Sequence, residues 1–198
     1  RQREVIDTAR KLAQQQPHHV GVQLLLAREL AADPNHQPEA EALYRTLAGQ
    51  YTRPDVYRGM FKLFQSTDQM NRVLSMIDET LGAIRSKDNS PDDREAAGEK
   101  YRAMTTVLRE EPDLVRSLLT AASRELRNFQ FGRKQNLETW TFLARLAAAT
   151  RQLDHAGGFY RQCLQLAGPL QKEQIHEGLI EVLRMARRWD RVVEVCSG

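Results

Sequence analysis

Apolar residues recur along this chain at intervals of three and four, the spacing that places them on one face of a helix. From Thr139, for example, the apolar positions Trp140, Leu143, Ala144 and Ala147 share such a face. Apolar and polar residues almost nowhere alternate with the period of two that marks a strand. The pattern therefore predicts an all-α chain.

The predicted helices come in pairs, and the pairs repeat. The apolar pattern breaks at Arg151-Gln152, resumes at Leu153 and ends at the stop signal Gly168-Pro169. A second unit breaks at Arg187-Arg188, and its next helix opens at Trp189, 36 residues after Leu153. Trp140, Tyr160 and Trp189 are predicted to be packing residues. A helix pair that recurs every ~34–40 residues is typical of a solenoid, in which each pair covers the next.

The same plan extends upstream with less regularity. Breaks fall at Ser66-Thr67-Asp68 and at the turn-rich residues 33–38, and residues 1–16 look like the second helix of a truncated pair. Residues 82–138 are predicted to form one irregular pair with long helices. Its first helix is capped by Ser90 and starts at Pro91, and its second starts at Pro112.

The unit from residue 139 to residue 169 carries a recognisable order of residue types, namely aromatic, Leu-small, Ala, aromatic, small and Pro. The residues in these places are Trp140, Leu143, Ala144, Ala156, Tyr160, Cys163 and Pro169. In this the chain resembles the tetratricopeptide repeat (TPR) family, with looser matches over about three quarters of its length.

The resemblance implies a right-handed superhelical solenoid of antiparallel helix pairs. Residues 1–198 would form a single domain of about five pairs, the first of them truncated. In the family, the first helices of the pairs line a concave groove that binds peptides or partner proteins. We therefore expect a non-catalytic scaffold for protein–protein interaction.

Residues one, five and eight places after the leading residue of a first helix share one stripe that points away from the packed face. The predicted groove residues are Arg58, Lys62, Gln65, Thr141, Arg145, Glu181 and Arg184, with Ala148 and Glu177 in the same stripes. The cations among them predict a groove suited to acidic or carboxylate-bearing segments. An ordinary hydrated surface is the alternative.

The net charge of +3 is modest, but basic residues gather in one region. Between Arg116 and Arg145 lie six cations and two acids, and the loop Arg127–Lys134 interleaves Phe129 and Phe131 with some of these cations. Such a region could bind nucleic acid through phosphate contacts and stacking, or could be a plain solvated surface. The interpretation that we favour for the two aromatic residues is that they anchor the loop. An architectural or oligomerising segment of a larger protein is a further alternative.

Motifs for catalysis are missing from the sequence. No phosphate-binding glycine loop, His-Glu-x-x-His pair or Gly-x-Ser-x-Gly elbow occurs. Cys163 and Cys196 lack metal-ligand spacing, so we expect no enzyme activity, metal or cofactor.

No apolar run is long enough to span a membrane. Arg1 opens the chain without a signal region, so we expect a fragment or a processed chain, with a cytoplasmic location favoured and the oligomeric state open. The pair Gly157-Gly158 predicts a close approach of two helices.

Overall fold

The computed structural model describes residues 2–127 and 137–197, and in these residues it is all-α. Eleven α-helices and one 3-10 helix make up this part of the chain. They are α1 (Gln2–Gln15), α2 (Val20–Ala31), η1 (Pro34–His36), α3 (Gln37–Gln50), α4 (Pro54–Ser66), α5 (Met70–Arg85), α6 (Pro91–Glu110), α7 (Pro112–Arg127), α8 (Leu137–Ala149), α9 (Leu153–Leu166), α10 (Pro169–Met185) and α11 (Trp189–Ser197).

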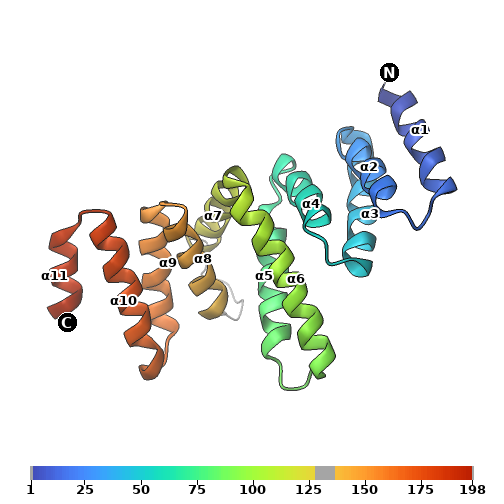
Figure 1. The fold of residues 1–198 in the computed structure, drawn as a ribbon. Coiled ribbons are helices and arrows are strands. Elements are labelled where there is room, and N and C mark those ends of the chain that lie inside the picture. The colour runs from blue at the N-terminus through green and yellow to red at the C-terminus, as the bar shows by residue number, and fades with distance from the viewer. Residues whose placement is uncertain (1, 128–136, 198) are drawn as a thin grey trace.

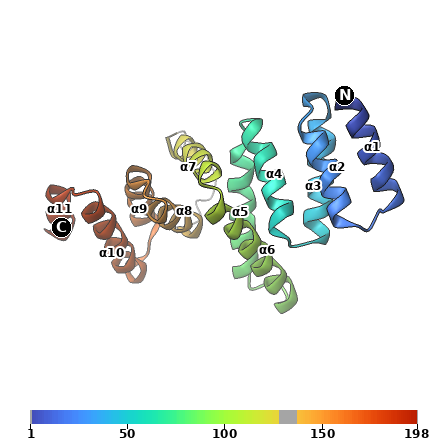
Figure 2. The same cartoon turned by 45° about the horizontal axis from the view of Figure 1, so that its top comes forward.

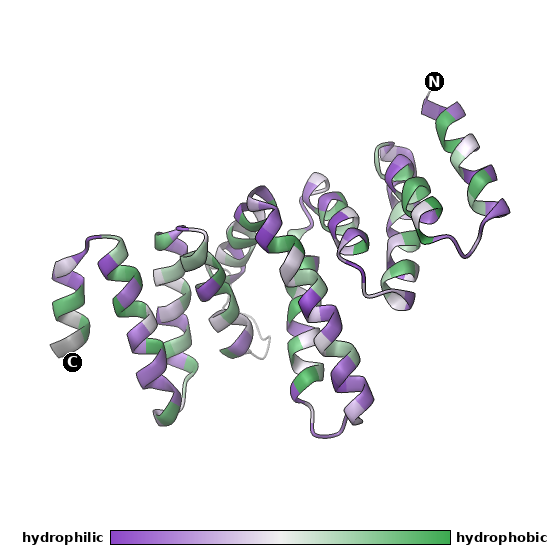
Figure 3. Cartoon of the chain, in the orientation of Figure 1, coloured by the Kyte–Doolittle hydropathy of each residue, from purple (hydrophilic) through white to green (hydrophobic). Residues whose placement is uncertain are grey.

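The helices follow one another in space as they do in sequence. Figures 1 and 2 show an elongated row from α1 at one end to α11 at the other. Within the described residues, extensive contacts join only helices that are at most three apart in chain order. Green and purple positions alternate around each helix in Figure 3, so the apolar face of one helix is buried on its neighbours.

Three of the predicted breaks form the same tight turn. Asp68, Arg151 and Arg187 each adopt a left-handed conformation, with φ between 52° and 57°. The next backbone N–H then bonds to the carbonyl oxygen five residues earlier, as in Gln152 to Ala147 at 2.8 Å. This is the Schellman ending of a helix, and it lets the second helix turn back at once. The breaks after α4, α8 and α10 are thereby confirmed.

The predicted start of α6 is also confirmed. Ser90 Oγ accepts a hydrogen bond from the N–H of Asp93 at 3.1 Å, and the Asp93 carboxylate accepts one from the N–H of Ser90 at 3.3 Å. Pro91 occupies the first turn, where its missing N–H costs nothing. This reciprocal cap satisfies backbone donors that the first turn would otherwise leave open.

The middle of the chain departs from a simple row of pairs. A single residue, Glu111, separates α6 from α7, and α5 packs more extensively against each of them than they do against each other. The loop after α7, with Phe129 and Phe131, falls at residues 128–136 and lies outside the described residues. Among the helices that the structure does describe, none is both long and apolar enough to cross a bilayer.

The core confirms most of the predicted packing positions but not all. Trp140 is 6% exposed and lies 5.6 Å from Phe159, between ring centroids. Tyr160 is buried too. The expectation that Trp189 is a packing residue was wrong, since its side chain is 59% exposed. In the described residues, α11 packs extensively on α10 alone, so the outward face of α11 stays open.

The two tryptophans should therefore differ in their effect on stability. Trp140→Ala leaves a cavity beside Phe159 and should lower the free energy of unfolding by about 3–5 kcal/mol. Trp189→Ala, with a mostly exposed ring, should lower it by less than about 1 kcal/mol. Urea titrations followed by circular dichroism measure both values. Equal losses for the two variants would contradict the packing described here.

Candidate functional site

Two hollows of similar size open along the row of helices. One, of about 870 Å³, is lined by residues of α5, α6, α8, α9 and α10, and we name it the α8–α10 groove. The other, of about 860 Å³, is lined by α2, α3 and α4, and we name it the α2–α4 hollow. In each, two successive first helices form the walls, and a second helix contributes a tyrosine between them.

The two hollows share matching positions on two of their walls. The residues that α2 contributes are matched by those that α8 contributes at a constant offset of 117. These matches are Gly21 with Glu138, Leu24 with Thr141, Leu25 with Phe142, Arg28 with Arg145, and Ala31 with Ala148. On the facing wall, α4 and α10 match at an offset of 119, namely Asp55 with Gln174, Arg58 with Glu177, Gly59 with Gly178, and Lys62 with Glu181. An internal repeat of structure therefore underlies both hollows.

A tyrosine lies directly over a glycine in each hollow. A Cβ atom built on Gly59 would lie 2.5 Å from the ring of Tyr44, and one built on Gly178 would lie 2.6 Å from the ring of Tyr160. Real Cβ atoms essentially never lie this close to another atom, so a side chain at either position would force the tyrosine ring or the helix to shift. The contact joins the second helix of one pair to the first helix of the next.

Burial governs the titration of both tyrosines. It raises the pKa of Tyr44 from 10.0 to about 12, with the nearby charge of Arg28 acting in the opposite direction. Burial likewise raises the pKa of Tyr160, while the charge of Arg145 and a hydrogen bond from it act against the shift. The same arginine–tyrosine arrangement is thus repeated in the two hollows.

The predicted groove residues on α4 do not present free cations. Arg58 pairs with Glu110 and, through Nε, with Glu111 at 3.2 Å. Lys62 Nζ lies 3.0 Å from the Glu111 carboxylate. Gln65 Nε2 donates to the backbone carbonyl of Asp113 at 3.1 Å and to the Oγ atom of Ser117 at 2.9 Å. This stripe is therefore engaged with the end of α6 and the start of α7.

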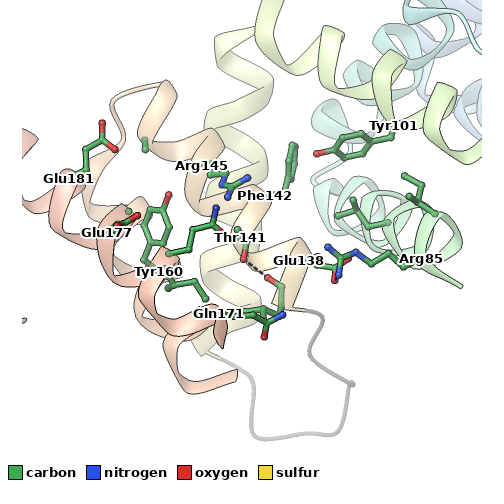
Figure 4. A pocket seen from close by; sticks show the side chains of 17 residues that line it. Arg85, Tyr101, Glu138, Thr141, Phe142, Arg145, Tyr160, Gln171, Glu177 and Glu181 are labelled. Atoms are coloured by element: carbon green, nitrogen blue, oxygen red, sulfur yellow. Dashed lines mark hydrogen bonds and ion pairs between the residues drawn. The ribbon is translucent and has the colours of Figure 1, made fainter. Parts of the chain in front are cut away.

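Three other predicted residues, Thr141, Arg145 and Glu181, meet in the α8–α10 groove. Figure 4 shows Arg145 between the Glu177–Glu181 side of α10 and the opposite side, from which Tyr101 projects. Among the described residues, no ion pair engages Arg145 or either of these glutamates. Thr141 Oγ1 donates to the carbonyl oxygen of Leu137 at 2.7 Å. Arg184, the last predicted residue, is exposed and lines neither hollow.

Sequence reasoning missed the side of the groove that α5 and α6 provide. The rings of Tyr101 on α6 and Phe142 on α8 meet edge to face, with 5.7 Å between centroids. Arg85 on α5 pairs with Glu138 at the start of α8. Both contacts join residues that are 41 and 53 positions apart, so no local pattern in the sequence could have indicated them.

The Arg116–Arg145 region is partly paired within the chain. Arg116 lies 3.3 Å from Asp113, and Arg124 lies 3.4 Å from Asp68. Arg133 and Lys134 fall outside the described residues. Within residues 2–127 and 137–197, no group of His, Cys, Asp and Glu is placed to hold a metal ion.

Comparison with known proteins returned no relative. No protein-family model matches the sequence, and neither the curated proteins nor the solved structures gave a match.

The glycines of this site allow a matched test of the tyrosine contact. Gly178→Ala forces its new methyl group into the Tyr160 ring and should destabilise the protein by about 1–3 kcal/mol. Gly158→Ala meets nothing within 4 Å and should stabilise helix α9 by about 1 kcal/mol. The close helix approach expected at Gly157-Gly158 was wrong, since a Cβ at either would meet nothing within 4 Å. Thermal unfolding of the two variants measures the contrast, and a neutral Gly178→Ala would refute the contact.

Stability should also fall at alkaline pH because of Tyr44. The pKa of this buried phenol in the folded chain, about 12, exceeds its ordinary value of 10.0. The folded state therefore holds the proton more tightly than the unfolded state, so this stabilisation is complete below pH 10 and is lost as the pH rises toward 12. Urea titrations across this range should show a smaller decline for Tyr44→Phe than for the wild type. An identical decline in both would contradict the assignment.

Proposed function

We propose that the chain is a TPR-like helical solenoid that acts as a non-catalytic scaffold and binds a segment of a partner protein in the α8–α10 groove. Support for the solenoid comes from the Schellman turns that recur after α4, α8 and α10, and from the two hollows related by offsets of 117 and 119 residues. A right-handed superhelix of stacked pairs belongs to the same proposal.

The observation that carries the function is the groove itself. Its volume of about 870 Å³ lies within the range of sites that hold ligands in proteins. Helices rather than loops form its walls, so a bound segment would meet side chains that are already in place, and preorganised sites lose less entropy on binding. Aromatic rings, amides and unpaired charges of both signs line it, which suits a peptide better than a purely apolar molecule.

The charges in the groove are weaker evidence for the chemical class of the partner than the groove is for the presence of a binding site. An acidic segment was expected from four cations, but Arg58 and Lys62 already pair with glutamates of this chain. Arg145 is then the cation that the groove offers. Nucleic acid binding through the Arg116–Arg145 region stays an alternative, although Arg116 and Arg124 each lie close to an aspartate.

Blocking the groove tests this function. Peptides selected from a random phage-displayed library on the wild-type chain should bind Gln174→Trp at least about tenfold more weakly, because the exposed Gln174 lines the groove. Gln165→Trp, at an exposed position of α9 outside both hollows, is the matched control and should bind normally. Fluorescence anisotropy measures the affinities.

Two outcomes would contradict the proposal. Selected peptides that bind Gln174→Trp and the wild type equally would place their site elsewhere. Tight binding of a single-stranded RNA oligonucleotide, falling steeply with salt and unaffected by Gln174→Trp, would favour the basic region.

A further inference from the structure

Helix α4, which forms one wall of the α2–α4 hollow, shows how adjacent charged residues can pair with two charges on such a wall, although the paired acids do not themselves line the hollow. On the α4 wall, Arg58 and Lys62 lie one helical turn apart, and two consecutive acids, Glu110 and Glu111, pair with both of them. Glu110 is the last residue of α6, and Glu111 lies between it and Pro112 at the start of α7. A pair of adjacent charged residues can therefore satisfy two charges placed four residues apart on this wall.

The equivalent positions on α10 carry the opposite charge. Glu177 corresponds to Arg58 and Glu181 to Lys62, and both glutamates are exposed on the groove wall. In the part of the chain that the structure describes, neither takes part in an ion pair. Like charges at this spacing repel one another on a helix, so a cation bound across them would relieve a local cost.

The rest of the groove suits a peptide that brings such cations. Arg145 lines the groove from α8 and can donate to the carbonyl groups of an extended backbone (Figure 4). The Tyr101–Phe142 pair supplies an apolar surface at the opposite side. The two carboxylates on the α10 wall would attract a positively charged segment and would repel an acidic one.

We propose that the α8–α10 groove recognises a partner segment with two consecutive basic residues, which pair with Glu177 and Glu181 as Glu110 and Glu111 pair with Arg58 and Lys62. This inference rests on the proposed function of the groove. It assigns the partner a chemistry opposite to the acidic one expected from the sequence. The sign of the charge at positions 177 and 181 determines which partner segment the groove binds.

Three peptide libraries with identical random flanks and a fixed central pair provide the probe. The pair is Arg-Arg in the first, Gln-Gln in the second and Glu-Glu in the third. The wild-type chain should retain most peptide from the Arg-Arg library, and retention should weaken as salt is added. For single peptides recovered from it, Glu177→Gln with Glu181→Gln should weaken binding about tenfold.

Two further variants separate the charge effect from general changes. Glu79→Gln with Glu95→Gln changes the net charge equally at exposed positions outside the groove, and should bind within about twofold of the wild type. Glu177→Arg with Glu181→Lys copies the wall of the α2–α4 hollow and should reverse the preference to the Glu-Glu library. Melting temperatures should stay close to that of the wild type, because both glutamates are exposed.

The inference and the proposed function fail in different ways. Preference of the wild type for the Glu-Glu library, or equal retention of all three libraries, would overturn the inference. Binding that is lost in Gln174→Trp but kept in the Glu177→Gln, Glu181→Gln variant would overturn the inference and leave the groove function standing. Binding that is insensitive to both would overturn both.

Discussion

The contact of a tyrosine ring with a bare glycine backbone is the constraint on which the arrangement of these helices depends. At Tyr44 over Gly59 and at Tyr160 over Gly178, the next helix passes so close that no side chain fits between them. The ring fills the junction and also lines the hollow that opens beside it. Stability and the position of the groove therefore have the same origin, since the residue that joins two pairs also forms the lining.

Charge then makes two similar hollows chemically different. The α2–α4 hollow has its wall cations held by glutamates of the same chain, whereas Glu177 and Glu181 on the α10 wall of the α8–α10 groove take part in no ion pair among the described residues. Repeated backbone geometry with diverged surface charge is how stacked helices can keep one architecture and acquire separate binding properties. In our proposal, the first hollow serves the fold and the second serves recognition.

The sequence predicted what depends on near neighbours and failed where distant residues decide. The helix breaks at residues 66–68 and 151–152 were predictable because local apolar spacing stops there. Trp189 was assigned to the core because its spacing is right, but burial needs a second helix against that face. The pairing of Arg58 with Glu110 spans 52 residues, and the glycine under Tyr160 lies 18 residues away from it. Both depend on how helices stack, which apolar periodicity alone does not encode.

Neighbour-only packing also has a consequence for how the chain reaches this structure. Extensive contacts link helices at most three apart, so most native contacts are formed between segments close in sequence. Chains of this kind form most of their native contacts by closing short loops. Closing a short loop costs little conformational entropy, which favours fast folding. Structure can nucleate at any well-packed junction and grow in both directions from it. A destabilising mutation at one junction would then slow the folding of the adjacent helices, while helices further along the row still form.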